Sequence, residues 1–121
     1  TAHEASFVKY GINTFLATKV TFFNQLYDIT KEHNANYNAI ISAIGSDPRI
    51  THSHTTVPGF DNKRGFGGAC FPKDTAAFEA FAKTFSLLST AISVNTKYRK
   101  NYKLDKREKE QNITFKDIGK K

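Results

Sequence analysis

The chain has 121 residues, of which 39% are hydrophobic and 24% are charged, with one Cys and neither Met nor Trp. This length accommodates one domain with a modest core, and the hydrophobic content excludes a wholly disordered chain. No run approaches the roughly 18 consecutive apolar residues of a membrane-spanning helix, so we expect no membrane association. A single Cys excludes an internal disulfide and favours a cytoplasmic protein.

The net charge of +7 is concentrated at the C-terminal end of the chain. Ten basic and four acidic residues lie between positions 97 and 121, so this stretch carries six of the seven net charges. A lysine-rich end is usually a solvated tail. An arm that binds nucleic acid or another polyanion is the less favoured interpretation.

The N-terminal quarter of the chain predicts one long helix. From residue 6 to residue 32, apolar residues recur at three- and four-residue steps without a Pro. They occupy much of the helix circumference, as the pairs Phe22-Phe23 and Leu26-Tyr27 indicate. A domain of this size can hardly cover all of them. We therefore expect this helix to be the spine of the fold and to contact a partner.

Shorter helices and one long loop are expected to follow. Asn36 is predicted to cap a helix that runs to Ile44, with Gly45 in the left-handed conformation that often ends helices. Residues 46–72 hold all three Pro and four of the seven Gly and are predicted to form a loop, and loops of this length are often functional. Two helices are expected at 73–85 and 87–102. The predicted fold class is therefore all-α, with a long glycine-containing active-site loop.

The C-terminal residues are predicted to contribute little to the core. We assign residues 1–104 to a central helical domain and residues 105–121 to a basic tail, which contains some helix at 106–111. Apolar residues are sparse after Leu104, so we expect the tail to be mobile. Removing it should leave the melting temperature nearly unchanged.

The segment Gly65-Phe66-Gly67-Gly68-Ala69-Cys70-Phe71-Pro72-Lys73-Asp74 carries the clearest chemistry. Glycines let a backbone approach a ligand closely, and Pro72 suits the first turn of a helix, which places Cys70 just before a helix N-terminus. The partial positive charge there, together with Lys73, stabilises a thiolate, which is the nucleophilic form of Cys. A buried structural Cys in a tight turn is an alternative that the residues alone leave equally open.

This segment resembles the nucleophile motif of the UDP-glucose/GDP-mannose dehydrogenase family. Residues 9–20 with Phe23-Asn24, and the segment Ile44-Gly45-Ser46-Asp47-Pro48-Arg49-Ile50, are similar to the long-helix segment of these enzymes and to the segment that leads into their substrate loop. The three motifs occur in the family's order and cover about residues 6–102. The resemblance implies the central, helical domain that holds the family's homodimer interface. Val57-Pro58-Gly59 and the polar turn after it resemble the UDP-glucose branch.

The resemblance implies a catalytic role for four residues. Cys70 matches the nucleophile, which forms a thiohemiacetal and then a thioester while a sugar C6 alcohol is oxidised to a carboxylate. Lys9 and Asn13 match the helix pair that holds the oxygen at the reacting carbon, and their i, i+4 spacing puts both on one helix face. Asp74 matches a carboxylate that positions the hydrolytic water or orients the lysine. Without the resemblance, Lys9 and Asn13 are ordinary polar residues of a helix surface.

The expected substrate-binding residues surround this motif or precede it. Arg49 matches an arginine that reaches the substrate across the dimer. The other expected substrate-binding residues are Phe66, Gly67 and Lys73. His52 and His54 lie two apart on the loop, but no third ligand is near in the sequence, so no metal site is predicted.

The family reduces NAD on an N-terminal Rossmann domain. This chain has no Gly-x-Gly-x-x-Gly after a strand and no room for βαβ units, so we expect NAD to be bound by a domain absent from it. The favoured interpretation is a central domain that supplies the Cys and the dimer interface to a UDP-sugar dehydrogenase and is inactive alone. The alternative is a stand-alone dimerisation or nucleotide-sugar-binding module without catalysis. A polyanion-binding helical module is the third interpretation.

Overall fold

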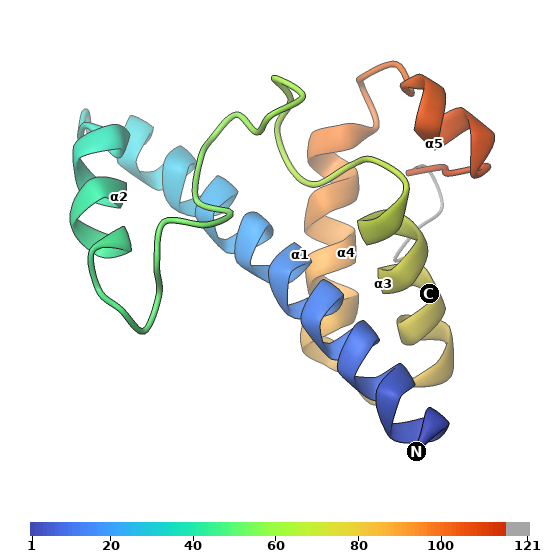
Figure 1. Cartoon of the computed structure of the whole chain (residues 1–121). Helices are drawn as coiled ribbons and strands as arrows, with labels where there is room; N and C mark the ends of the chain where they lie inside the picture. The colour runs from blue at the N-terminus through green and yellow to red at the C-terminus, as the bar shows by residue number, and fades with distance from the viewer. Residues whose placement is uncertain (116–121) are drawn as a thin grey trace.

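The computed structural model describes residues 1–115, and all regular structure within them is helical (Figure 1). The prediction of an all-α fold is confirmed. In chain order the helices are α1 (Ala2–Glu32), α2 (Tyr37–Gly45), α3 (Cys70–Phe81), α4 (Ser86–Arg99) and α5 (Lys106–Glu110).

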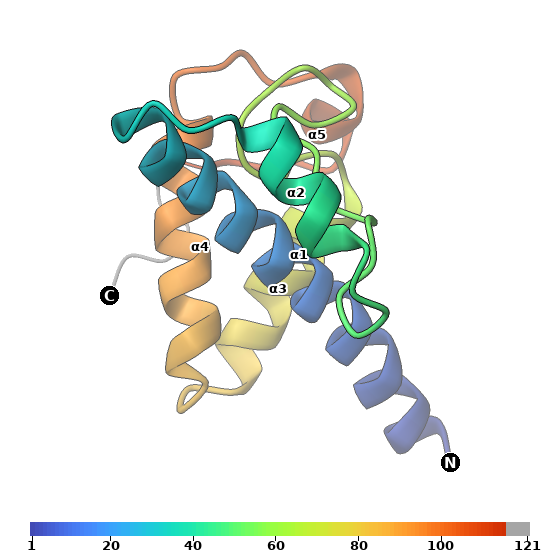
Figure 2. The same ribbon diagram turned by 90° about the vertical axis from the view of Figure 1, so that its left-hand side faces the viewer.

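α1 is the spine of the molecule, as predicted. It begins at Ala2, four residues earlier than expected, because Thr1 and Glu4 form a capping box in which the Thr1 hydroxyl accepts the Glu4 N–H at 3.1 Å. α3 and α4 pack against one side of α1 and against each other, and α2 lies on the opposite side (Figures 1 and 2). The segment between α2 and α3 crosses α1 and brings the start of α3 back to it.

Apolar side chains of α1 divide between a buried side and an exposed side. Phe23 is buried with Tyr37 of α2 and Val57 of the loop, and Ala17 of α1 and Leu88 and Ile92 of α4 are each buried as well. The other side of the helix remains exposed, with Phe15 at 66% and Phe22 at 61%. The expectation that α1 carries apolar residues on more than one face is therefore confirmed. The large exposed hydrophobic residues of α1 are Phe7, Val8, Ile12, Phe15, Phe22 and Ile29.

The prediction for α2 was correct at its start and wrong at its end. Asn36 is the N-cap, and its side-chain oxygen accepts the Ala39 N–H at 3.1 Å. Gly45 is a helical residue and not a left-handed terminator, because the chain continues through Ser46 in a right-handed conformation. The glycine serves another purpose here. A Cβ at Gly45 would meet the imidazole ring of His52.

α3 begins at Cys70, three residues before the predicted start at residue 73. Pro72 has no N–H, but the N–H groups of the first helical turn have no partner within the helix in any case. The helix can therefore begin before Pro72. The loop between α2 and α3 therefore comprises residues 46–69. α3 and α4 also end earlier than predicted, at Phe81 and Arg99.

The prediction that the C-terminal residues pack little is wrong for residues 105–115. Glu108 of α5 is 1% exposed, and Ile113 and Phe115 are 8% and 4% exposed. Asp105 caps α5, and its side chain accepts the Glu108 N–H at 2.8 Å. Two apolar residues and one carboxylate thus hold this segment against the body although its composition is polar. Ile118, the remaining apolar residue of the predicted tail, lies outside the described residues.

Candidate functional site

The contact between α1 and α3 brings two of the predicted catalytic residues together. The Asn13 Nδ2 of α1 donates a hydrogen bond to the Asp74 Oδ2 of α3, with 2.6 Å between the two atoms. Asp74 is 1% exposed, so this amide is a major partner of a buried carboxylate. Cys70 lies four residues before Asp74 on the same helix, and residues at this spacing share one helix face.

The two carboxylate oxygens of Asp74 differ in their hydrogen-bond partners. Asp74 Oδ1 is buried and accepts no hydrogen bond from the described residues. The nearest charged group is the Lys73 ammonium, whose Nζ lies 4.0 Å from Oδ1 and whose side chain is 52% exposed. Buried carboxylate oxygens are almost always hydrogen-bonded in proteins, so the unpaired Oδ1 is an exception to this rule.

Cys70 is exposed at the first position of α3. Its exposure excludes the alternative of a buried structural Cys. The residue before it, Ala69, is the N-cap of α3 and supplies no side-chain hydrogen bond to the first turn. The first-turn N–H groups of α3 and the positive end of its dipole therefore lie near Cys70, and no side chain of the N-cap residue caps them.

Two further expected site residues, Lys9 and Arg49, have other neighbours in this chain. Lys9 is exposed on α1, and its ammonium lies 5.6 Å from the ring centroid of the neighbouring Tyr10. Arg49 lies in the turn after α2, and its side chain is 86% exposed. The segment that follows α2 lies on the opposite side of α1 from α3 (Figures 1 and 2). The Arg49 guanidinium donates to both carboxylate oxygens of Asp47, at 3.0 and 2.7 Å, and these bonds lower the pKa of Asp47.

The glycine segment before Cys70 is held from its inner side by asparagine side chains. Asn24 Oδ1 accepts the Gly65 N–H at 2.9 Å. Asn95 forms two bonds to Phe66, accepting its N–H at 2.6 Å and donating to its carbonyl at 3.0 Å. The Phe66 ring is buried as well, so this expected substrate-binding residue uses both its side chain and its backbone to anchor the loop.

An arginine and a glutamate complete this inner support. Arg99 Nη2 donates to the Gly65 carbonyl at 3.1 Å, and Glu108 Oε2 accepts the Gly68 N–H at 2.9 Å. Gly67 lies directly over these two side chains, because a Cβ there would collide with the Arg99 guanidinium and lie 2.6 Å from Glu108 Oε2. We call the four supporting residues the loop cradle: Asn24, Asn95, Arg99 and Glu108.

Sequence reasoning missed the loop cradle. Arg99 and Glu108 were counted with the charged residues of the C-terminal stretch, where composition gives no sign of burial. Asn95 did carry a signal, because it continues the stripe of Leu88 and Ile92 on α4, and a polar residue in an apolar stripe needs a partner. Asn24 follows the buried Phe23 on α1, but nothing in the sequence indicates that its partner is residue 65.

The two loop histidines have separate neighbours. The His54 ring lies against that of Phe71, with 5.9 Å between centroids, and His52 Nε2 lies 3.3 Å from the Ser42 carbonyl oxygen. Burial, and to a smaller extent the charge of Lys19, lowers the pKa of His54. Among residues 1–115, no group of three or more His, Cys, Asp or Glu side chains could hold a metal ion.

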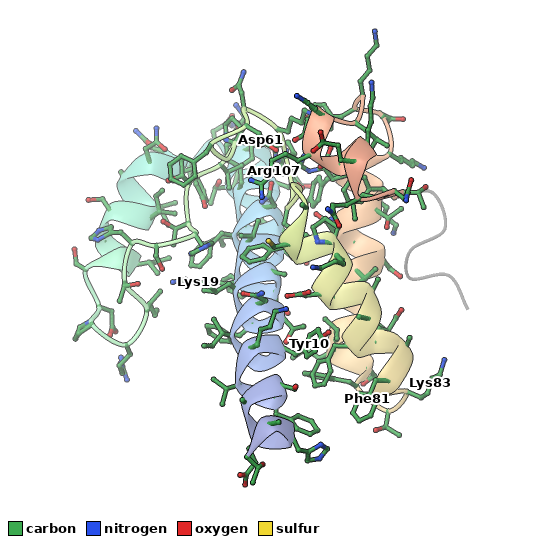
Figure 3. All side chains as sticks on the ribbon, turned by 45° about the vertical axis from the view of Figure 1, so that its right-hand side comes forward. Tyr10, Lys19, Asp61, Phe81, Lys83 and Arg107 are labelled. Carbon is green, nitrogen blue, oxygen red and sulfur yellow. The ribbon has the colours of Figure 1, made fainter. Side chains whose placement is uncertain are left out.

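The side-chain view shows how the rest of the α1–α3 contact is filled (Figure 3). Tyr10 lies between the two helices and stacks on Phe78 at 5.6 Å between centroids, and Phe81 and Lys83 mark the far end of α3 from Cys70. Lys19 lies on the loop side of α1 and donates to the Ile50 carbonyl at 2.6 Å. In the described part of the chain, every helix is too short or too polar to cross a membrane.

Comparison with known proteins decides the family. Residues 3–97 match the UDP-glucose/GDP-mannose dehydrogenase family, central domain. The chain belongs to this family. The match covers the α1–α3 contact, Cys70 and most of α4, and it ends before Arg99 and Glu108.

Individual relatives agree with the family assignment. The chain is similar to the UDP-glucose 6-dehydrogenases TuaD and YwqF of Bacillus subtilis (strain 168), with 37% identity over 100 residues and 39% over 96 residues. It is also 38% identical over 101 residues to a UDP-glucose 6-dehydrogenase of Streptococcus pneumoniae. These alignments cover 79%, 76% and 83% of this chain but only 21%, 21% and 24% of the relatives. The chain thus spans about a fifth of the length of the curated relatives it matches.

The family uses NAD, and the described residues do not fit this cofactor. A dinucleotide site is built where parallel strands end and a glycine-rich turn leads into a helix. Residues 1–115 form no strand. The glycines at 65–68 therefore connect a loop to a helix, and not a strand to a helix. We therefore assign no NAD-binding role to these residues.

Proposed function

We propose that this chain is the domain of a UDP-glucose 6-dehydrogenase-like enzyme that supplies the nucleophilic Cys and the dimer interface, and that it acts in the cytoplasm. One observation carries the proposal. Asp74, which is buried and accepts a hydrogen bond from Asn13 of α1, lies on the face of α3 that also bears the exposed Cys70. Burying the Asp74 carboxylate costs desolvation energy, and this cost favours a functional geometry over an ordinary helix contact.

The reaction assigned to Cys70 is addition to an aldehyde at C6 of the sugar. The sulfur forms a bond to the aldehyde carbon, the carbonyl π bond opens, and the thiol proton is transferred to the new hydroxyl oxygen. Asn13 uses one amide hydrogen on Asp74 and has a second for the substrate oxygen. Asp74 fixes the direction of that amide, and Lys9, one turn away on α1, adds positive charge.

The proposed substrate-binding residues act in two ways. Lys73 exposes its ammonium three residues after Cys70 and attracts the phosphates of a nucleotide sugar. Phe66 and Gly67 act through the backbone conformation that they help to fix. Arg49 is proposed to serve the site of the second protomer, because its side chain is exposed and the segment after α2 lies on the other side of α1 from α3.

A homodimer through α1 is the second part of the proposal. Phe15, Phe22 and Ile12 are exposed by more than half on the longest helix of the fold. Exposed aromatic and aliphatic side chains in a row are typical of interfaces between subunits. This surface also fits the alternative function, a dimerisation module without catalysis, so the two functions must be separated by the chemistry of Cys70.

The catalytic part is tested by protection of Cys70 against iodoacetamide. The 121-residue chain is incubated with the 6-aldehyde of UDP-glucose, and the alkylation rate is followed by mass spectrometry. We expect the aldehyde to slow alkylation about tenfold at millimolar concentration, and Asn13→Ala to lose most of this protection. Gln25→Ala, an exposed residue of the same helix, is the matched control.

Absence of protection by the aldehyde at millimolar concentration contradicts the catalytic proposal. The dimerisation module then becomes the favoured function. UDP alone serves as a second control, because protection by UDP without the aldehyde indicates binding and not addition to the thiol.

The dimer is tested by sedimentation equilibrium of the wild-type chain and of Phe15→Ser. We expect a dimer at micromolar concentration that the substitution weakens by at least about tenfold, since a buried aromatic side chain contributes roughly 1.5–3 kcal/mol. Far-UV circular dichroism should show the variant to be folded, because Phe15 is exposed within one chain. A monomeric wild-type chain at these concentrations contradicts this part of the proposal.

A further inference from the structure

We propose that Arg99 and Glu108 are positioning residues of the candidate site, which fix the backbone of residues 65–68 and thereby place Cys70. The inference rests on the proposed function of Cys70. It extends the functional unit beyond residues 3–97, the part of the chain that matches the family.

The burial of these two side chains is the first observation. Arg99 is 2% exposed and Glu108 is 1% exposed, although both belong to the most highly charged stretch of the chain. Each bonds to the backbone of the glycine segment: Arg99 to the Gly65 carbonyl at 3.1 Å and Glu108 to the Gly68 N–H at 2.9 Å. The last of these groups is two residues before Cys70.

The charge balance around Arg99 is the second observation. Its guanidinium lies 2.8 Å from Asp61 Oδ2 and 3.8 Å from Glu108 Oε2, so this one cation forms ion pairs with two carboxylates. Asp61 comes from the loop and lies at the same end of the molecule as Arg107 of α5 (Figure 3). Removing two charges from water costs about as much as their attraction returns, so such a group is weak evidence for stability. Its strong directionality instead suits the task of holding one backbone conformation.

The backbone that they hold is the third observation. Gly65 has φ +74° and Gly68 has φ +81°, so both ends of the segment are in the left-handed region. Glycines lose more conformational freedom on folding than other residues. A segment with three of them is therefore held in one conformation only by hydrogen bonds from residues outside the segment. Arg99 and Glu108 supply these bonds at opposite ends of the segment.

Two substitutions of Glu108 test the inference in the 121-residue chain. Glu108→Ala removes the acceptor of the Gly68 N–H, whereas Glu108→Gln keeps an acceptor oxygen at nearly the same place. Glu110→Ala, an exposed glutamate of the same helix, is the matched control. The two readouts are amide hydrogen exchange at Gly68 and the rate of Cys70 alkylation by iodoacetamide at pH 7.

We expect Gly68 to exchange at least about tenfold faster in Glu108→Ala, because a charge-assisted hydrogen bond to a buried N–H is lost. Cys70 alkylation should slow by about threefold or more, since the helix dipole acts only through an ordered first turn. Glu108→Gln should restore most of both effects, and Glu110→Ala should change neither. A variant Glu108→Ala that melts at lower temperature but leaves both readouts unchanged would overturn the inference.

A glycine variant tests the same inference from the loop side and does not depend on the folding of Glu108→Ala. Gly67→Ala inserts a methyl group against Arg99 and Glu108, and we expect the same two changes. Gly11→Ala is the control, because a Cβ at Gly11 has no atom within 4 Å. Unchanged exchange and alkylation in Gly67→Ala would also overturn the inference.

The protection of wild-type Cys70 by the 6-aldehyde of UDP-glucose separates this inference from the proposed function. If the variants change exchange and alkylation but the aldehyde gives no protection, Arg99 and Glu108 position Cys70 and the catalytic proposal fails. If the aldehyde protects Cys70 but the variants leave both readouts unchanged, the catalytic proposal stands and the positioning role is overturned.

Discussion

The candidate site has an outer face, formed by Cys70, Lys73 and Asp74 at the start of α3, and an inner face, where the loop cradle supports the glycine segment. The two faces differ in the burial of their polar groups. On the outer face, Cys70 and Lys73 are exposed, and Asp74 alone is buried. On the inner face, all four residues of the loop cradle lie against the segment, and all four are at most 2% exposed.

This difference shows that the residues of a reactive motif and the residues that shape it follow different rules. The outer face needs access, so its residues contribute little to stability. The inner face must satisfy backbone N–H and C=O groups that no helix or sheet satisfies, and buried polar side chains do this. Substitutions on the inner face should therefore cost stability first, whereas those on the outer face should cost function first.

The largest effect is expected from removing all residues after Leu104, which deletes part of the inner face. The loss of Ile113 and Phe115 alone should lower the free energy of unfolding by about 3–6 kcal/mol, and Arg99 is left with one carboxylate in place of two. Urea unfolding followed by circular dichroism measures this change. A truncated chain as stable as the full one would show that the inner face does not depend on residues 105–115.

Asn95→Ala should break the inner face at one point. The Phe66 N–H and carbonyl would both lose their partner in a buried place, which should cost about 2–4 kcal/mol of unfolding free energy. Asn101→Ala, an exposed asparagine just after α4, is the control and should cost less than about 0.5 kcal/mol. Equal costs for the two variants, measured by urea unfolding, would contradict the anchoring role of Asn95.

Asn13→Ala tests whether the outer face is the functional one. It removes the hydrogen bond to a buried carboxylate, at a cost of about 1–2 kcal/mol in unfolding free energy. The same variant should remove most of the aldehyde protection of Cys70, a larger fractional loss than its loss of stability. The outer face would not be the functional one if stability fell but protection by the aldehyde stayed at the wild-type level.

The smallest effect is expected from His54, which lies beside Phe71 at the edge of the outer face. Its pKa is lowered in the folded chain from 6.5, so the unfolded chain binds the proton first as the pH falls. Protonation of His54 therefore lowers stability as the pH falls through and below 6.5. His54→Asn, which tolerates the positive φ of this position, should show a smaller drop in melting temperature over this range.

His33→Asn is the control for this pH measurement, because it removes another exposed imidazole outside the loop. It should leave the pH dependence of the melting temperature close to that of the wild type. The same drop in His54→Asn and in the wild type would show that His54 does not contribute.

Local sequence patterns were sufficient to predict most of the fold. The apolar repeat of residues 6–32, the cap at Asn36 and the position of Pro72 depend on neighbours a few residues away, and each identified a helix. The exact ends were less accurate, because a capping box at Thr1 and the turn after Gly45 depend on details of single side chains.

The residues proposed for the candidate site came from one contiguous motif and from the family resemblance. Cys70 and Asp74 belong to one short segment, and Asn13 was added by the resemblance to the family. The loop cradle joins residue 24 to residue 65, residue 95 to residue 66, and residue 108 to residue 68. No periodicity or spacing indicates pairs separated by 29 to 41 residues, so only the three-dimensional structure could identify them.

The late position of Glu108 in the chain has a consequence for the order of folding. The acceptor for the Gly68 N–H lies 40 residues further along the chain, so synthesis from the N-terminus completes α1, the loop and α3 before this acceptor exists. Contacts between distant residues form late because loop closure must precede them. During synthesis, the segment that carries Cys70 therefore reaches its final conformation only after residue 108 has been added.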